Sequence, residues 1–318
     1  MRVLITGITG FVGSYMADYC IGKGCEVYGL IRHRSSLKNI EHIVDKITLL
    51  EGNLLDLPSM YRVMNEVKPD RIFHLAAQSY VLYSWQAPQQ TLNTNVLGTT
   101  NLLESVKNIA PAADVLIIGT SEEYGLVKSE ELPIKETNEL RPLSPYGISK
   151  VAADFLGWTY FRSYGLKIVR TRAFNHTGPR RGKEFVLPAF VRQVLRLRKG
   201  LTNSIKVGNL EAIRDFTDVR DIVKAYWLAL EAGDKGEVYN VCTGSGRKIE
   251  DVLGNIAATV FGPDAKVKIE RDELRMRPAD VPVLVGDCTK FYRHTGWMPV
   301  ITFNQTIRDL IEYEEQYV

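Results

Sequence analysis

The sequence predicts an α/β protein with a doubly wound parallel Rossmann sheet and a smaller α/β substrate-binding lobe. Short apolar runs alternate with helical patterns through the first half of the chain, as repeated strand–helix–strand units do. Glycines spaced by three residues follow the first apolar run, at Gly7, Gly10 and Gly13. After Asn175 this regular alternation is replaced by basic turns and isolated elements, which predicts a second lobe.

The first-half elements are read from periodicity and from their turn residues. Continuous apolar runs are typical of buried parallel strands, and apolar positions three or four residues apart indicate helices. Strands are expected at Val3–Ile5, Val27–Ile31, Ile47–Leu50, Arg71–Leu75, Val115–Ile118 and Lys167–Thr171. Helices are expected at about 11–24, 57–67, 89–107 and 146–163.

The second half predicts a helix at 185–200 and a second helix that Arg214–Val219 opens and that runs through Leu230. Val238–Val241 and Val267–Ile269 look like short strands of the smaller lobe. We expect one domain at 1–174 plus about 214–236. The other is expected at about 175–213 plus 237–318.

Composition excludes several classes of function. With a net charge of +3 over 318 residues and no basic block interleaved with aromatics, a nucleic-acid partner is not expected. No apolar stretch approaches the length of a membrane span, and no leader pattern precedes the first strand. The four cysteines form no Cys-x-x-Cys pair, which favours reduced thiols and a cytoplasmic location. The histidines do not cluster with carboxylates, so no metal is predicted.

The glycine turn predicts a dinucleotide site. At a first strand-to-helix turn, this spacing allows a tight bend, and the helix amino terminus offers free N–H groups to a pyrophosphate. The residues expected to contact the cofactor here are Gly7, Thr9, Gly10, Phe11, Val12 and Gly13.

The second strand predicts which cofactor binds. An acid at its end would bind the ribose 2′-OH of NAD, whereas arginine favours the 2′-phosphate of NADP. The strand is followed by Arg32 and Arg34 with no acid in reach, so NADP is predicted. We expect Asn53 and Leu54 to flank the adenine. The small residues after the fourth strand, Leu75, Ala76 and Ala77, are expected where the dinucleotide crosses the sheet.

Four residues form the predicted catalytic set. Thr120 and Glu122 follow the run Val115–Ile118, and they would point the same way if that strand continued. Tyr-x-x-x-Lys occurs at Tyr124–Lys128 and at Tyr146–Lys150. Only the second pair lies in a helical pattern, where residues i and i+4 share a face. We expect Lys150 to lower the pKa of Tyr146 and to hold the nicotinamide ribose, so that the phenolate can act as a base.

These residues carry a family resemblance over essentially the whole chain, which is similar to the extended short-chain dehydrogenase/reductases. Within them it resembles GDP-mannose 4,6-dehydratase at Ala76–Ser79, Thr120–Glu122, Ser144–Tyr146, Phe174–His176 and Pro179–Gly182. Val207–Ala212, Arg214–Val219 and Val238–Cys242 look as much like the GDP-4-keto-6-deoxy-mannose reductases, and the chain is short for a dehydratase of this kind.

The resemblance implies an enzyme, and the dehydratase interpretation is favoured because Glu122 would be superfluous in a simple ketoreductase. In a dehydratase, Thr120 would polarise the C4 oxygen, and Glu122 would act at C5 and then on the leaving oxygen. NADPH-dependent 4-keto reduction is the alternative; an epimerase or a non-catalytic NADP-binding protein is less favoured. Implied partners are a GDP-linked sugar and further copies of the chain, as a homodimer or homotetramer.

The resemblance also implies contacts to the ligands. His176 would touch the nicotinamide. Substrate contacts would come from Gln78, Ser79, Thr120, Ser121, Glu122, Asn175, Arg180, Arg214 and Arg277. Arg214 and Arg277 would clamp the diphosphate, and Arg180 is a weaker candidate.

Overall fold

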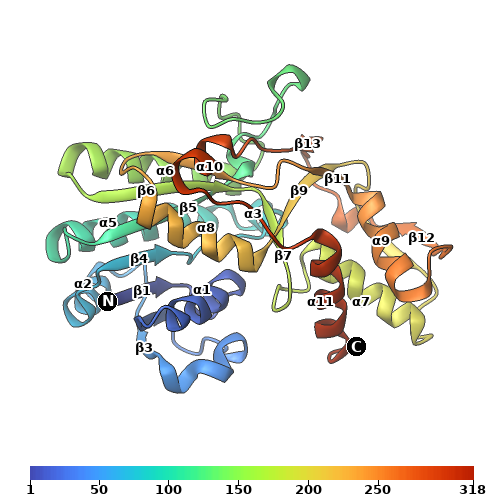
Figure 1. Ribbon diagram of the computed structural model, residues 1–318, viewed down its shortest axis with the longest axis horizontal. Helices are drawn as coiled ribbons and strands as arrows, with labels where there is room; N and C mark the ends of the chain where they lie inside the picture. Colours follow the sequence, from blue (N-terminus) through green and yellow to red (C-terminus); the bar gives the residue numbers. More distant parts are fainter.

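The computed structural model describes residues 1–318, and the larger of its two lobes is built on one parallel sheet (Figure 1). The seven strands lie in the order β3-β2-β1-β4-β5-β6-β10. The chain adds strands outward from β1 first on one side and then on the other, so the strand order reverses between β1 and β4. Their bounds are β1 Arg2–Thr6, β2 Glu26–Ile31, β3 Thr48–Glu51, β4 Arg71–His74, β5 Asp114–Thr120, β6 Lys167–Ala173 and β10 Val238–Val241. The predicted doubly wound Rossmann sheet is confirmed.

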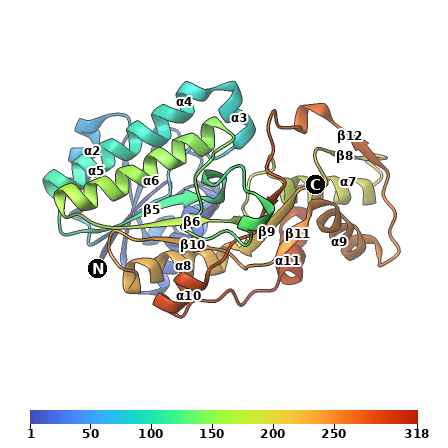
Figure 2. The same ribbon diagram turned by 90° about the horizontal axis from the view of Figure 1, so that it is seen from above.

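Helices cover both faces of this sheet, and Figure 2 shows the two layers. Alternate strand residues point to opposite faces, so Val3 and Ile5 lie in one buried cluster while Leu4 lies in the other. One face is covered by α2 (Leu57–Val67), α5 (Gly98–Ile109) and α6 (Pro145–Tyr164). The other is covered by α1 (Phe11–Gly22), α8 (Val219–Ala232) and α10 (Thr289–Thr295).

Sequence periodicity placed α1, α2 and α6 within two residues of their ends. It did not predict α10, and it expected a single helix at 89–107. The chain instead forms α3 (Val81–Gln86), α4 (Pro88–Leu92), a π-helical turn at Asn93–Leu97, and then α5. None of the helices is long and apolar enough to cross a membrane.

The smaller lobe holds a four-stranded sheet, a two-stranded sheet and three helices, at the right of Figure 1. Its strands are β7 (Asn175–Thr177), β8 (Ile205–Val207), β9 (Ile213–Asp218), β11 (Gly246–Lys248), β12 (Ile269–Arg271) and β13 (Val283–Leu284). Its helices are α7 (Val186–Arg198), α9 (Ile249–Phe261) and α11 (Phe303–Glu315), which enclose a separate apolar core.

The boundary between the lobes differs from the prediction in three places. Arg214–Val219 does not open a helix, because Ile213–Asp218 forms β9 of the small sheet and α8 begins at Val219. Val238–Val241 is not a strand of the smaller lobe, because it pairs in parallel with β6 at the edge of the large sheet. Residues 289–295, which were expected in the smaller lobe, form α10 of the larger lobe, where Phe291 is fully buried in the core. A run of four residues such as Val238–Val241 carries too little pattern to reveal which sheet it joins.

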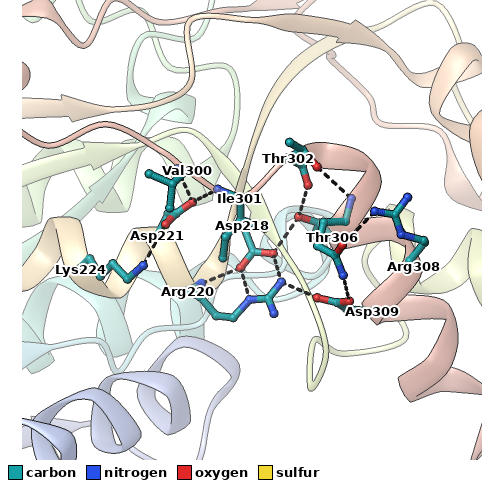
Figure 3. A network of polar contacts seen from close by, with 11 residues as sticks. Asp218, Arg220, Asp221, Lys224, Val300, Ile301, Thr302, Thr306, Arg308 and Asp309 are labelled. Carbon is teal, nitrogen blue, oxygen red and sulfur yellow. Dashed lines mark hydrogen bonds and ion pairs between the residues drawn. The ribbon is translucent and has the colours of Figure 1, made fainter.

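A network of polar contacts joins the two lobes where β9 becomes α8 (Figure 3). The buried Asp218 carboxylate accepts hydrogen bonds from the Arg220 backbone N–H (2.8 Å) and from the Arg220 guanidinium (2.7 and 2.8 Å). It also accepts one from the Thr306 hydroxyl of α11 (2.7 Å). Arg220 reaches Asp309 of α11 at 2.6 Å. One carboxylate therefore caps a helix of the larger lobe and holds a helix of the smaller lobe.

This network predicts that Asp218 contributes strongly to stability. Asp218→Ala should lower the free energy of unfolding by about 3 kcal/mol, because it leaves a half-buried guanidinium without its main partner. Thr306→Val removes one hydrogen bond and should cost about 1 kcal/mol. Urea unfolding followed by tryptophan fluorescence measures both. Lys248→Ala, which breaks a surface ion pair, is the matched control and should change stability by less than about 0.5 kcal/mol. Equal effects of Asp218→Ala and the control would contradict the assignment.

Candidate active site

A cleft of about 910 Å³ lies between the two lobes and follows the carboxyl ends of the large sheet's strands. It is lined at one end by the glycine turn after β1 and by Arg32, and at the other by Arg214 and Arg277 of the smaller lobe. Thr120, Glu122, Tyr146 and Lys150 line its middle. The cleft is large enough for a dinucleotide and a second ligand side by side.

The glycines of the turn after β1 allow backbone segments of the chain to pack closely against one another. A Cβ on Gly13 would lie 2.1 Å from the Gly7 carbonyl oxygen, and one on Gly7 would lie 2.8 Å from the Ala76 nitrogen. Gly10 precedes α1 and offers no side chain to cap it. The first turn of α1 therefore presents its N–H groups to the cleft, where Thr9, Phe11 and Val12 also lie. These residues fit the pyrophosphate of a dinucleotide.

The turn after β2 places only one of its two predicted arginines at the cleft. Arg32 and Ser35 line the cleft, and the Ser35 hydroxyl accepts a hydrogen bond from the Arg32 backbone at 3.1 Å. Arg34 is exposed, has a left-handed backbone (φ 60°) and does not line the cleft. Arg32 makes no ion pair, so its guanidinium is available to an anion. Asn39, which sequence analysis missed, lines the cleft and donates to the Thr9 carbonyl at 3.1 Å.

The segment after β4 forms the floor of the cleft. Leu75, Ala76 and Ala77 line it as expected, and so do Asn53 and Leu54 after β3. Gln78 lines it too, but its side-chain amide is already bound to Tyr80 and Thr91.

Asn95 holds this segment in place and was missed from the sequence. Its buried side chain accepts from the Gln78 N–H at 2.8 Å and donates to the Gln78 carbonyl and the Ser149 hydroxyl, both at 2.9 Å. Asn95 lies in the π-helical turn, which no periodicity of the sequence announces.

Thr120 and Glu122 do not share a strand, contrary to the expected alternation. β5 ends at Thr120, and Ser121–Glu123 form a 3₁₀ turn that Thr120 caps. The turn arises because the Glu123 carboxylate accepts from the Thr120 backbone N–H at 2.7 Å. Both predicted side chains still reach the cleft, because the turn folds back over the end of the strand.

Glu123, to which sequence analysis assigned no role, is completely buried. Arg172 of β6 lies 3.2 Å from it and also pairs with Asp154 of α6 at 2.6 Å. Burial and the nearby Asp154 raise the pKa of Glu123 to about 8. This carboxylate therefore fixes the turn that carries Thr120 and Glu122.

Tyr146 and Lys150 lie one turn apart on α6, which begins after Ser144 caps it with a hydrogen bond to the Gly147 N–H at 3.0 Å. Lys150 donates to the Ile118 carbonyl at 2.8 Å, and burial lowers its pKa to about 8. Burial, with the negative charge of Glu122, raises the pKa of Tyr146, and a hydrogen bond with Thr120 opposes that rise. The expectation that Lys150 lowers the Tyr146 pKa is not met by the protein alone.

Asn175 and His176 follow β6 and enter the cleft from the smaller lobe's first strand. The Asn175 side-chain oxygen is buried without a partner, which is the state expected of a ligand contact. The His176 ring stacks on Phe11 with centroids 6.2 Å apart, and burial lowers its pKa to about 3. His176 is therefore a neutral ring beside the glycine turn.

Two adjacent arginines, Arg180 and Arg181, follow β7. Sequence analysis selected Arg180 as a substrate contact, but in the structure Arg181 is the one whose charge is available to a ligand. Arg180 pairs with Asp18 of α1 at 2.7 Å. Arg181 has no ion pair; its guanidinium lies 3.9 Å from the Phe185 ring centroid and 5.0 Å from that of Phe11. Burial lowers its pKa to about 10, which still leaves a full positive charge at neutral pH. Arg180 remains at the cleft wall, but its charge is already compensated.

Arg214 and Arg277 reach the cleft from the smaller lobe and meet Asp280. Arg214 pairs with it at 2.8 Å, and Arg277 approaches it at 3.7 Å. Arg277 also makes an ion pair of 3.0 Å with Glu122. Ser79 and Ser121 line the same part of the cleft. The structure thus brings together every predicted site residue except Arg34.

The unpaired Arg32 predicts tighter binding of NADP⁺ than of NAD⁺. Titration of each dinucleotide, followed by calorimetry, should show the difference, because the 2′-phosphate gains a charge-assisted hydrogen bond. Arg32→Asp should reduce or reverse the preference, and Arg34→Asp, the matched control outside the cleft, should change it less. Equal affinity of the unmodified protein for the two dinucleotides would show that Arg32 does not select the cofactor.

Known proteins are similar in sequence to this chain over nearly its whole length. The family model described as GDP-mannose 4,6 dehydratase matches residues 4–310. A GDP-mannose 4,6-dehydratase of Vibrio cholerae is 33% identical, with 97% of this chain and 92% of that protein covered. A GDP-6-deoxy-D-mannose reductase of Pseudomonas aeruginosa is also 33% identical, with 100% and 98% covered.

The fold of the chain is also similar to that of a solved structure. The structure of RMD from Pseudomonas aeruginosa complexed with NADPH superposes with a TM-score of 0.84 at 31% identity, covering 100% of both chains. Sequence, fold and cleft together show that the chain belongs to the GDP-mannose 4,6-dehydratase family.

Proposed function

We propose that the protein is an NADP-dependent lyase that converts GDP-mannose to GDP-4-keto-6-deoxy-mannose. The observation that carries this proposal is the position of Glu122, which lines the cleft together with Thr120 and Tyr146 and whose negative charge raises the pKa of the Tyr146 phenol. A 4,6-dehydratase needs a carboxylate beside the groups that oxidise C4, because water must leave between C5 and C6. The family and the dehydratase relatives support the same activity.

NADP fits the residues at the deep end of the cleft. The glycine turn and the α1 amino terminus would hold the pyrophosphate, and Arg32 with Ser35 would hold the 2′-phosphate. When bound, the cofactor supplies a hydride acceptor for C4 and returns the hydride to C6. The Pseudomonas protein crystallised with NADPH supports this assignment.

Tyr146 would remove the proton of the C4 hydroxyl during oxidation, and Lys150 on the same helix face would hold the ribose. Burial and the negative charge of Glu122 raise the pKa of Tyr146, so its phenolate depends on positive charge brought by bound ligands. Lys150 begins to lose its proton just above neutral pH, because burial lowers its pKa to about 8.

Glu122 and Thr120 would complete the elimination. With C4 oxidised, the C5 hydrogen becomes acidic, and the Glu122 carboxylate can take that proton. It then donates the proton to the departing C6 hydroxyl, which leaves as water. When hydride is added at C6, C5 takes up a new proton that Glu122 has drawn from solvent. The Thr120 hydroxyl would polarise the C4 oxygen.

Substrate binding is assigned to the arginines of the smaller lobe. Arg214 and Arg277 would bind the diphosphate, and the unpartnered Asn175 oxygen would accept a hydrogen bond from the ligand. Arg181 is a further cation at the cleft without an ion pair. Guanine and mannose are assigned from the names of the relatives.

A second function is NADPH-dependent reduction of GDP-4-keto-6-deoxy-mannose. It is favoured by the 3.0 Å ion pair between Glu122 and Arg277, because a reductase could keep this acid only to position the arginine. The Pseudomonas reductase, matched end to end, supports this alternative.

We also propose that the protein is a homo-oligomer, a dimer or tetramer, that pairs through α6. This helix exposes Ile148, Phe155 and Trp158, each 45–52% accessible, along one side. The neighbouring Leu92 and Leu97 extend the apolar surface. A two-fold axis beside α6 would bury this patch against the same patch of a second chain. A cytoplasmic location stays a prediction.

Incubation with GDP-mannose and a trace of NADP⁺ should release one water per sugar without net consumption of cofactor. In D₂O the product should carry deuterium at C5, because Glu122 exchanges its proton with solvent. Mass spectrometry and NMR of the product measure both. Glu122→Gln should stop water loss while sparing C4 oxidation, which leaves reduced cofactor on the protein. Indifference to GDP-mannose, with stoichiometric NADPH oxidation by the 4-keto-6-deoxy sugar, would establish the reductase instead.

Tyr146→Phe should lower kcat about 10²–10⁴-fold, as loss of a general base does, while cofactor binding stays nearly unchanged. Tyr124→Phe is the matched control from the other Tyr-x-x-x-Lys pair. The Tyr124 hydroxyl is buried and donates to Asn240 at 2.6 Å, so its loss should cost about 1–3 kcal/mol of stability but little turnover. If the two variants had similar kcat values, Tyr146 would not be the base.

A further inference from the structure

Glu122 does two incompatible things in the proposed reaction cycle. Its carboxylate is needed as a proton acceptor in the cleft, yet its Oε1 lies 3.0 Å from Nη1 of Arg277. Both partners are largely shielded, with side chains 12% and 27% exposed, so water screens the pair weakly. While this oxygen is bound to Arg277, the carboxylate is not free to approach a substrate carbon.

Arg277 is held less firmly than the neighbouring Arg214. Arg214 pairs with Asp280 at 2.8 Å and donates to the Ile213 carbonyl at 2.9 Å. Asp280 is itself fixed by Asn209 at 2.8 Å. Arg277 has one close partner, Glu122, and Asp280 only at 3.7 Å. Arg277 is therefore the arginine that can change partner without dismantling the wall of the cleft.

A nucleotide diphosphate is a stronger partner for Arg277 than Glu122 is. It carries more negative charge than one carboxylate, and its oxygens can bind a guanidinium through two parallel hydrogen bonds. Burial disfavours the charged form of Arg277, but Glu122 and Asp280 outweigh it and raise its pKa, so the cation persists when its partner changes.

Resting on the proposed function, we propose that the diphosphate of the bound nucleotide sugar takes Arg277 from Glu122 and thereby frees this carboxylate for proton transfer. The base is held inactive until the sugar's own diphosphate is seated. An enzyme with bound cofactor and no substrate then carries no free carboxylate beside Tyr146. Arg277 acts as a positioning residue for Glu122 as well as a ligand of the diphosphate.

The competition can be measured by binding, without turnover, in a double-mutant cycle. The probe is GDP, titrated by calorimetry into protein saturated with NADP⁺. Glu122→Gln should tighten GDP binding about five- to tenfold, because Arg277 no longer has to leave a partner. In the Arg277→Gln background, which itself weakens GDP binding, Glu122→Gln should give no tightening. Arg277→Lys, which keeps the charge, should retain part of the effect.

Arg214→Gln is the matched control. It also removes a diphosphate ligand, but Arg214 is not paired with Glu122, so Glu122→Gln should still tighten GDP binding in that background. Equal tightening in the Arg277→Gln background would show simple charge repulsion by Glu122 and overturn the proposal. So would the absence of tightening in the otherwise unmodified protein.

The same titrations separate this inference from the proposed function. UDP and dTDP are titrated beside GDP, and the cycle is carried out with whichever nucleotide binds most tightly. Preference for UDP or dTDP would contradict GDP-mannose as the substrate, while the cycle would still decide whether the diphosphate displaces Glu122 from Arg277.

Discussion

A buried group of charges behind the cleft holds the catalytic elements in register. Arg172 of β6 pairs with Asp154 of α6 at 2.6 Å and with Glu123 at 3.2 Å, and Arg170 pairs with Asp154 at 2.6 Å. Asp154 follows Tyr146 by two helical turns, and Glu123 closes the turn that carries Thr120. The helix that supplies the phenol and the turn that supplies the hydroxyl are thus fixed to the same strand. Breaking such a group leaves a buried charge without a partner, which costs several kcal/mol.

The burial that orders these elements also determines the charge states at the cleft. It lowers the pKa of Lys150 to about 8 and that of His176 to about 3, and it raises the pKa of Tyr146. Each shift favours the uncharged form, as desolvation does. The protein alone therefore places the reactive groups without making them reactive. Charges of the bound ligands must therefore activate these groups. A positive charge beside Tyr146 lowers the pKa of its phenol, and in our proposal a diphosphate beside Arg277 releases the Glu122 carboxylate.

The sequence predicted the elements whose cause is local. The glycine turn, α6 with its proline start, and the apolar strands all follow from spacing within one short segment. What it missed depends on distant partners. Nothing near Glu123 in the sequence indicates that it is buried, because its partner Arg172 comes from the distant strand β6. Arg180 and Arg181 are indistinguishable in the sequence, and only the position of Asp18 on α1 decides which one is neutralised. The edge strand β10 is too short to show which sheet it completes.

The same limit explains why motifs alone separate dehydratase from reductase poorly. Both activities need Tyr146, Lys150 and the Thr120 hydroxyl, and the motif around Glu122 does not say what its carboxylate contacts. In the structure that carboxylate forms an ion pair with Arg277 and lines the same cleft as Tyr146. An acid that stays with Arg277 throughout serves only to place a diphosphate ligand, which a reductase also needs. An acid that is released is free to act as a base in the cleft. In our proposal the two activities therefore differ in how strongly Glu122 binds Arg277 compared with the nucleotide diphosphate. That difference is determined by three-dimensional contacts.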